Sequence, residues 1–277
     1  MAHTGRRPDD QSRNDSPSKL KVFLTGASSG IGRALAEYYA SQGAFLGLCA
    51  RRGELLEELS ARWPGQINVY PLDVTDADAL LTAADDYLGR LGVPDVVIAN
   101  AGFGVNGYFE DLSLDDYKRQ FETNVVGVLD TIYQTLPELK KTKGNLALLC
   151  SVSGHIPFSL STAYSMSKYA VKALGLGLRQ ELKKDGVSVT LISPGFVESE
   201  ILYVNANGEK TDKKNYDVSS FLVMPTPKAA KKMAKAILKR KRERIITAHG
   251  WLGVQLYRFF PSLVEKLVHE GNPKKKK

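Results

Sequence analysis

The stretch Lys21-Val-Phe-Leu-Thr-Gly-Ala-Ser-Ser-Gly-Ile-Gly-Arg33 decides the fold. It begins as a short apolar strand, turns through three glycines and continues into a helical pattern. Glycines let the backbone turn tightly and approach a pyrophosphate, and the N–H groups that open the next helix favour phosphate. The stretch therefore predicts a dinucleotide-binding turn. The residues expected to contact the dinucleotide there are Gly26, Ser28, Ser29, Gly30, Ile31 and Gly32.

Outward from this turn, strand and helix patterns alternate along the chain. Strands are expected at residues 21–25, 45–50, 68–72, 95–100, 145–151, 188–193 and 244–248. Helices are expected at residues 31–42, 54–63, 77–91, 114–139, 163–184 and 228–239. Several strands are nearly continuous apolar runs, which is typical of parallel strands covered on both faces. The pattern predicts an α/β fold, a Rossmann-type doubly wound parallel sheet of about seven strands.

The domain organisation follows from length and composition. The chain has 277 residues, 43% of them hydrophobic, which suits a single large domain. We expect a disordered polar leader over residues 1–18 and a cofactor and catalytic domain over 19–250, with a substrate loop at 198–227. Residues 251–277 read as an amphipathic helical extension with a basic tail.

Charge and cysteine content exclude several classes of protein. The net charge of +8 is concentrated in residues 228–244 and 274–277, so the body of the chain is not a nucleic-acid-binding surface. Cys49 and Cys150 lie in apolar runs and are expected to be buried, reduced thiols, which favours a cytoplasmic location. Histidines and cysteines show no zinc spacing, so no metal site is expected.

A second chemical feature is Tyr164 and Lys168, four residues apart in an expected helix. This spacing places both side chains on one helix face. A phenol with a pKa near ~10 is a poor acid–base catalyst at neutral pH, and a nearby ammonium lowers that pKa. The pair therefore indicates proton transfer beside the dinucleotide.

The end of the second expected strand indicates which dinucleotide is bound. An acidic residue there would bind the ribose hydroxyls, but Ala50 stands in its place, followed by Arg51 and Arg52. An arginine suits a 2′-phosphate, so NADP(H) is predicted over NAD(H). Arg52 has the alternative role of a solvated charge at the start of a helix.

With Tyr-x-x-x-Lys, the Thr-Gly-x-x-x-Gly-x-Gly turn resembles the signature of the short-chain dehydrogenase/reductase family, and the resemblance runs over residues 20–248. It implies a nicotinamide-dependent oxidoreductase, usually a homodimer or homotetramer. Further matching positions, in chain order, are Asp73, Val74, Asn100, Ala101, Gly102, Asn124, Ser151, Pro194, Gly195, Val197 and Ser199.

The resemblance also implies roles for the catalytic set. Tyr164 would be the general acid and base, and Lys168 would also bind the nicotinamide ribose. Ser151 would hold the substrate oxygen, with Ser153 as a competitor close in sequence. Asn124 would hold a water that links Lys168 to solvent.

The resemblance implies cofactor contacts too. Asp73 would lie near the adenine, and Ser199 would contact the carboxamide unless it is a simple loop hydroxyl.

The substrate and the partners are less closely defined by the sequence. Apolar residues in the 198–224 loop and near residues 103–109 and 156–158 would suit a small hydrophobic carbonyl or alcohol, although many could be core. Residues 251–270 would contact a membrane peripherally, or else dock on protein. His155 would meet substrate or form a hydrogen-bonded wall. A dinucleotide-binding scaffold or redox sensor with little turnover is the alternative function, which the intact catalytic set disfavours.

Overall fold

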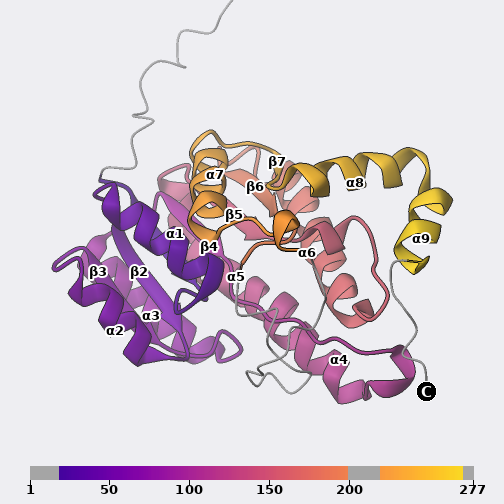
Figure 1. Cartoon of the computed structure of the whole chain (residues 1–277). Coiled ribbons are helices and arrows are strands. Elements are labelled where there is room, and N and C mark those ends of the chain that lie inside the picture. Colours follow the sequence, from indigo (N-terminus) through magenta and orange to yellow (C-terminus); the bar gives the residue numbers. More distant parts are fainter. Residues whose placement is uncertain (1–18, 199–218, 271–277) are drawn as a thin grey trace, which may run out of the picture.

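The computed structural model describes residues 19–198 and 219–270, and within them seven parallel strands form one sheet (Figure 1). The strand order is β3-β2-β1-β4-β5-β6-β7, so the chain winds outward from β1 and then crosses back to β4. A dinucleotide binds at such a switch point, beyond the carboxyl ends of the strands. The strands are β1 (Lys21–Thr25), β2 (Phe45–Ala50), β3 (Ile67–Pro71), β4 (Val96–Ala99), β5 (Asn145–Leu149), β6 (Ser188–Ser193) and β7 (Glu243–Ile245).

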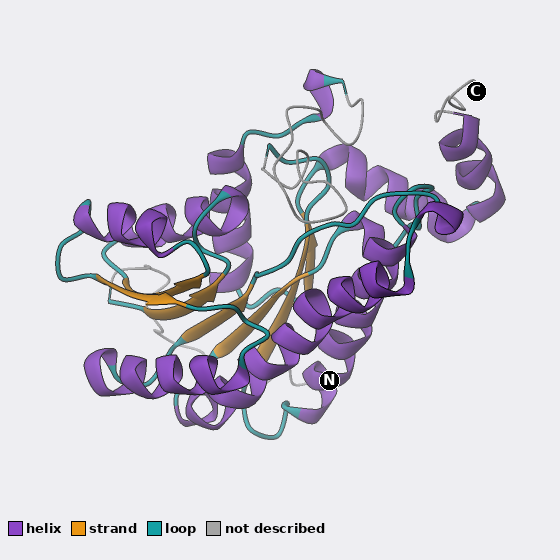
Figure 2. Ribbon diagram, turned by 90° about the horizontal axis from the view of Figure 1, so that it is seen from below, coloured by secondary structure: helices purple, strands orange, loops and turns teal. Residues whose placement is uncertain are grey.

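Helices cover both faces of the sheet, as Figure 2 shows. One buried apolar cluster joins the sheet to α1 (Gly30–Ser41), α2 (Gly53–Ala61) and α7 (Thr226–Leu238). The other joins the opposite face to α3 (Ala77–Leu91), α5 (Gly127–Lys141) and α6 (Thr162–Glu181). The predicted doubly wound α/β fold is therefore confirmed, because strands buried on both faces need apolar cover on both sides.

Some expected boundaries are wrong. The strand expected at 244–248 ends at Ile245, because Thr247 accepts a hydrogen bond at its Oγ1 from the N–H of Gly250 and so caps a helix. The strand expected at 145–151 ends at Leu149, where the chain turns into the 3-10 turn Val152–Gly154. Cys49 and Cys150 are buried free thiols, as expected.

The helix expected over 114–139 is interrupted. It consists of α4 (Leu114–Phe121) and α5, joined by a π-helical turn at Glu122–Val126. Within that turn Asn124 is fully buried. A π-helical turn inserts one residue into a helix and is frequent at functional sites.

The C-terminal extension expected from residue 251 is helical, but it divides into α8 (Ala248–Phe259) and α9 (Pro261–Glu270). Pro261 opens α9, a position where its missing N–H costs nothing. Val264 packs with Val152 and Ile156, so α9 lies against the turn that follows β5. No helix in residues 19–198 and 219–270 has both the length and the apolarity needed to cross a bilayer. The expectations for residues 1–18, for Ser199 and most of the substrate loop, and for residues 271–277 lie outside the described residues.

Candidate active site

The glycine turn between β1 and α1 has a backbone that only glycine tolerates. Gly26 has φ +69° and Gly30 has φ +51°, in the left-handed region that disfavours side chains. A Cβ on Gly26 would lie 2.7 Å from Ala101 Cα, and one on Gly32 would overlap the Gly26 carbonyl oxygen. Ser29, the N-cap of α1, makes no capping hydrogen bond with its side chain. The turn therefore presents bare backbone and a helix N-terminus, which suits a pyrophosphate.

Asn100 ties this turn to the end of β4. Its Nδ2 donates to the carbonyl oxygens of Thr25 at 2.9 Å and Gly26 at 3.0 Å. In return, Thr25 Oγ1 accepts from the backbone N–H groups of Asn100 and Ala101, both at 3.2 Å. These bonds join the carboxyl ends of β1 and β4, the two strands that flank the switch point.

Two arginines follow the end of β2. Arg52 donates from Nη2 to the Oγ of Ser28 at 3.3 Å, so it reaches the glycine turn. Arg51 is exposed, and its Nη1 lies 3.7 Å from Asp73 Oδ2. The other oxygen of Asp73 accepts from the N–H and hydroxyl of Thr75. Arg52, which the sequence also allowed as a solvated charge, therefore contacts the turn, whereas Arg51 lies beside Asp73.

Asn124 and Gln120 together hold the loop that follows β4. Asn124 Oδ1 accepts from the N–H of Phe103 at 3.0 Å, while its Nδ2 donates to Phe103 O and to Ser167 Oγ. Gln120 donates to the same carbonyl at 2.8 Å and accepts from the N–H of Val105 at 2.6 Å. Both amides are fully buried. Sequence reasoning missed Gln120, and its position one helical turn before Asn124 was the available signal.

Neighbouring expected contacts are packed close by. Val74 is buried, and a Cβ on Gly127 would lie 2.7 Å from its Cγ2. A Cβ on Gly102 would lie 2.9 Å from Asn124 Oδ1 and 3.6 Å from Lys168 Nζ. Gly102 therefore keeps the space between the loop and the lysine open.

Lys168 is the buried cation of the site. It is 5% exposed, and its Nζ donates to the carbonyl oxygen of Leu149 at 2.9 Å. The same Nζ lies 5.6 Å from the centre of the Tyr164 ring, so the two residues expected to act together do lie together. Burial lowers the pKa of the Lys168 ammonium to about 8, against a smaller opposing effect of Cys150.

Ser151 follows β5 directly and begins the 3-10 turn. Its Oγ accepts from the N–H of Ser153 at 3.1 Å, which leaves the hydroxyl proton available to a ligand. The next N–H, that of Val152, donates to Pro194 O at 2.9 Å, so the turns after β5 and β6 are joined.

The turn after β6 packs against the start of α8. A Cβ on Gly195 would overlap Thr247 Oγ1 and lie 3.1 Å from His249 Nε2. The His249 ring stacks on Phe196, and burial lowers its pKa. Val197 is buried beyond this turn.

Every described group in this candidate site therefore follows the carboxyl end of a strand or lies on a helix beside those ends. The glycine turn, the arginines and Asn100 surround the switch point. Ser151, Tyr164 and Lys168 lie beyond β5 on the turn and helix that follow it. The site thus combines a glycine turn with bare backbone, which suits a dinucleotide, and a phenol beside a buried ammonium, which suits proton transfer.

Comparison with known sequences gives a consistent family. Residues 20–210 match the short chain dehydrogenase family. Dehydrogenase/reductase SDR family member 7B of Bos taurus is 32% identical over 270 residues, covering 92% of this chain and 82% of that protein. The 11-beta-hydroxysteroid dehydrogenase A of Sesamum indicum is 30% identical, covering 91% of this chain and 76% of that protein.

Solved structures give the same fold. A short-chain dehydrogenase from Streptomyces avermitilis has a TM-score of 0.75 at 25% identity, covering 92% of this chain and 99% of its own. A short chain dehydrogenase/reductase from Burkholderia phymatum, solved in complex with NAD, has a TM-score of 0.79 at 23% identity, with coverage of 90% and 96%. The second likeness is one of fold alone.

Proposed function

Because the chain belongs to the short-chain dehydrogenase/reductase family, we propose that it transfers a hydride between NADP(H) and a carbonyl or secondary alcohol. The chain is an oxidoreductase of that family with a nucleotide-binding Rossmann fold. The observation that supports the proposed reaction best is the buried Lys168 ammonium beside the Tyr164 ring. The left-handed backbone at Gly26 and the close approach of Gly32 to the Gly26 carbonyl give the tight turn that a dinucleotide-binding motif needs.

The proposed chemistry divides between three side chains. When bound, the nicotinamide supplies or accepts the hydride. In the direction of reduction Tyr164 donates a proton to the substrate oxygen, and Ser151 donates a hydrogen bond to the same oxygen. Lys168 holds positive charge beside the phenol, which favours the phenolate that forms. In oxidation the phenolate takes the proton back.

Asn124 has a supporting role in this proposal. Both N–H groups of its amide are used, by Phe103 O and Ser167 Oγ. The Oδ1 accepts from the N–H of Phe103 and has a second lone pair, which can accept from the water that would link Lys168 to solvent. The side chain itself fixes the loop against which the cofactor would lie.

NADP(H) preference is proposed from the charge at the end of β2. Ala50 offers no carboxylate to the ribose, and Arg51 and Arg52 offer two guanidinium groups. The contact of Arg52 with Ser28 supports a part for Arg52, beside Arg51, in binding a 2′-phosphate. The Burkholderia phymatum protein was solved with NAD, and the two chains are 23% identical.

A hydrophobic small-molecule substrate is proposed from the apolar side chains in the loops that follow the carboxyl ends of the strands. Large apolar residues are exposed in the loops on this side, among them Tyr108, Phe109, Phe221 and Leu222. The sesame relative is named a hydroxysteroid dehydrogenase, which fits an apolar alcohol or ketone. We therefore expect an extended apolar carbonyl to bind better than a short polar one.

The test is NADPH consumption by purified protein across a panel of apolar ketones and aldehydes, with short polar carbonyls as the matched set. The proposal expects turnover that favours the apolar members. Tight NADPH binding without turnover of any member would contradict the reaction, and would favour the dinucleotide-binding scaffold.

A peripheral membrane contact is proposed for α8 and α9. Half of the large exposed apolar side chains on these helices and the break between them are aromatic, and Arg258 and Lys266 lie in the same helices. The exposed apolar residues are Trp251, Leu252, Leu256, Phe259, Phe260 and Leu263. Flotation with anionic vesicles should carry the protein upward at low salt, and Trp251→Ser with Phe259→Ser should abolish this. Docking on a second subunit is the alternative, and it predicts no flotation.

A homodimer or homotetramer is also proposed. Exposed apolar side chains occur on α4, α5 and α6, where Leu114 is 70%, Tyr133 73% and Met166 48% exposed. Such side chains are enriched where subunits meet. Light scattering at several concentrations should give a mass above that of one chain, and Leu114→Lys with Tyr133→Lys should lower it.

A further inference from the structure

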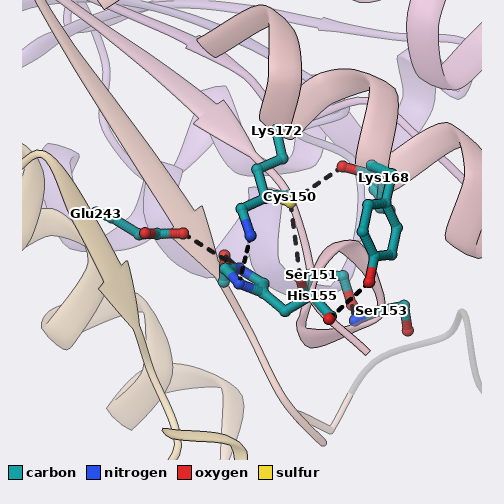
Figure 3. A network of polar contacts seen from close by, with 9 residues as sticks. Cys150, Ser151, Ser153, His155, Lys168, Lys172 and Glu243 are labelled. Carbon is teal, nitrogen blue, oxygen red and sulfur yellow. Dashed lines mark hydrogen bonds and ion pairs between the residues drawn. The ribbon is translucent and has the colours of Figure 1, made fainter. Parts of the chain in front are cut away.

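A buried polar network surrounds His155, directly after the turn that carries Ser151. The His155 side chain is only 5% exposed. Figure 3 shows Lys172 reaching it from α6 and Glu243 reaching it from β7. Its Nδ1 lies 2.8 Å from Lys172 Nζ, and its Nε2 lies 2.9 Å from Ser193 Oγ and 3.1 Å from Glu243 Oε1. Both ring nitrogens are thus used inside the protein, so His155 is a hydrogen-bonded wall residue.

The partners decide which ring nitrogen carries the proton. A lysine ammonium only donates, so Nδ1 accepts from Lys172 and the proton lies on Nε2. At Nε2 it faces the Ser193 oxygen at 2.9 Å, and Glu243 Oε1 lies 3.1 Å from the same nitrogen. The hydrogen bond from His155 and the charges of the nearby cations lower the pKa of Glu243, which is therefore a carboxylate. The network therefore runs from Lys172 through the His155 ring to Ser193 and the Glu243 carboxylate.

This network joins the serine turn to the catalytic helix. The Tyr169 hydroxyl donates to the His155 carbonyl oxygen at 2.6 Å, so α6 binds both the side chain and the backbone of His155. Gly154 packs tightly on the same helix, because a Cβ there would lie 2.8 Å from Lys168 O. The Gly154 N–H in turn donates to the Ser151 carbonyl oxygen at 3.0 Å.

We propose that His155 is a positioning residue that holds the Ser151 turn against α6, so that the Ser151 and Tyr164 hydroxyls keep a fixed separation. The inference rests on the proposed function for its catalytic consequence, but its structural part stands apart from that function. Displacements of about 1 Å at a reacting centre cost rates of about a hundredfold.

Two replacements of His155 separate its hydrogen bonds from its bulk. His155→Phe keeps a ring but has no nitrogen, and should lower kcat about tenfold to a hundredfold while the Kd for NADPH changes less than about twofold. His155→Asn places an oxygen near the position of Nδ1, so it keeps the acceptor for Lys172 and should restore most of kcat. Lys172→Met should reproduce the loss, and Lys235→Met on the exposed face of α7 should not.

Hydrogen exchange of the amides in residues 151–156 gives a readout that needs no turnover. Exchange there should accelerate in His155→Phe and Lys172→Met, with little change in β1 to β4. Wild-type exchange in both variants would overturn the inference, as would equal loss of kcat in His155→Asn and His155→Phe. If His155→Phe does not fold, kcat and amide exchange in Lys172→Met are compared with wild type instead. Absence of turnover in the wild type would contradict the proposed function, while the exchange result would still decide the positioning role.

Discussion

Tyr164 and Lys168 lie one turn apart on α6 but in different surroundings. Tyr164 is half-buried, whereas Lys168 is held beneath it by the carbonyl of Leu149. Because the ammonium is fixed by the sheet and not by solvent, its charge acts on the phenol in a medium of low dielectric constant. The proposed proton transfer therefore depends on one hydroxyl and one fixed cation.

Tyr164→Phe removes that hydroxyl and little else. We expect kcat to fall by at least about a thousandfold, because general acid catalysis contributes on the order of 10²–10⁴ and the Ser151 hydroxyl is a much weaker acid than a phenol. The Kd for NADPH, measured by fluorescence titration, should stay within about threefold of wild type. Tyr133→Phe, at an exposed tyrosine on α5, is the control and should retain full kcat. Retained turnover in Tyr164→Phe would contradict the assignment.

The lowered pKa of Lys168 predicts that kcat/KM for NADPH falls at alkaline pH. With its pKa lowered to about 8, the ammonium loses its proton as the pH rises through about 8 in the free protein. The profile of kcat/KM for NADPH reports the free enzyme, so it should fall above that pH. Lys168→Arg keeps the charge and should remove this limb, even at a lower overall rate. A limb that persists in that variant belongs to another group.

The same shift has a consequence for stability. Between about 8 and 10.5 the unfolded chain holds a proton on Lys168 that the folded chain has lost. Stability rises with pH wherever the unfolded state binds more protons. The burial cost of Lys168 is therefore fully present below about pH 8 and is relieved as the pH rises through that window.

At the scale of elements, replacing glycine by alanine should have opposite effects on stability in the glycine turn and in α3. Gly26→Ala should lower the free energy of unfolding by at least about 2 kcal/mol, because it combines a left-handed backbone with an overlap against Ala101. Gly89→Ala lies in α3 with no atom within 4 Å of the new Cβ, and should raise that free energy by about 0.5–1 kcal/mol. Denaturant unfolding measures both. If both variants changed the free energy of unfolding equally, the backbone of the turn would not require glycine at residue 26.

Some elements of the fold could be predicted from sequence patterns, and others could not. The strands were predictable because parallel strands are continuous apolar runs, and Tyr164 with Lys168 because their spacing matches a helix turn. The π-helical turn at Glu122–Val126 was not predictable, because one inserted residue hardly disturbs the apolar period of residues 114–139. The contact of His155 with Glu243 was hidden as well, since only the placement of β7 beside β6 brings them together. The break before Pro261 could have been read from the proline itself.

For the whole molecule, cofactor binding and folding are linked. A ligand at about a hundredfold its Kd stabilises the native state by about 2.7 kcal/mol. At equal concentrations NADPH should therefore raise Tm more than NADH does. Arg51→Asp should shrink the NADPH shift and enlarge the NADH shift, because a carboxylate repels the 2′-phosphate and accepts from ribose hydroxyls. Arg90→Asp, on the exposed end of α3, is the control. Unchanged shifts in Arg51→Asp would contradict the predicted preference.

The order of the strands also affects how long the native state survives. The switch point lies between β1 and β4, which are separated in the chain by two other strands, and Ser151 and Pro194 come later still. The groups of the proposed cofactor site thus come from parts of the chain that are far apart, so a dinucleotide should bind the folded protein and not partly folded chains. Bound cofactor should accordingly slow the unfolding rate and leave the folding rate almost unchanged. In a cell where the dinucleotide saturates its site, proteases should therefore degrade this protein more slowly, because the native state unfolds less often.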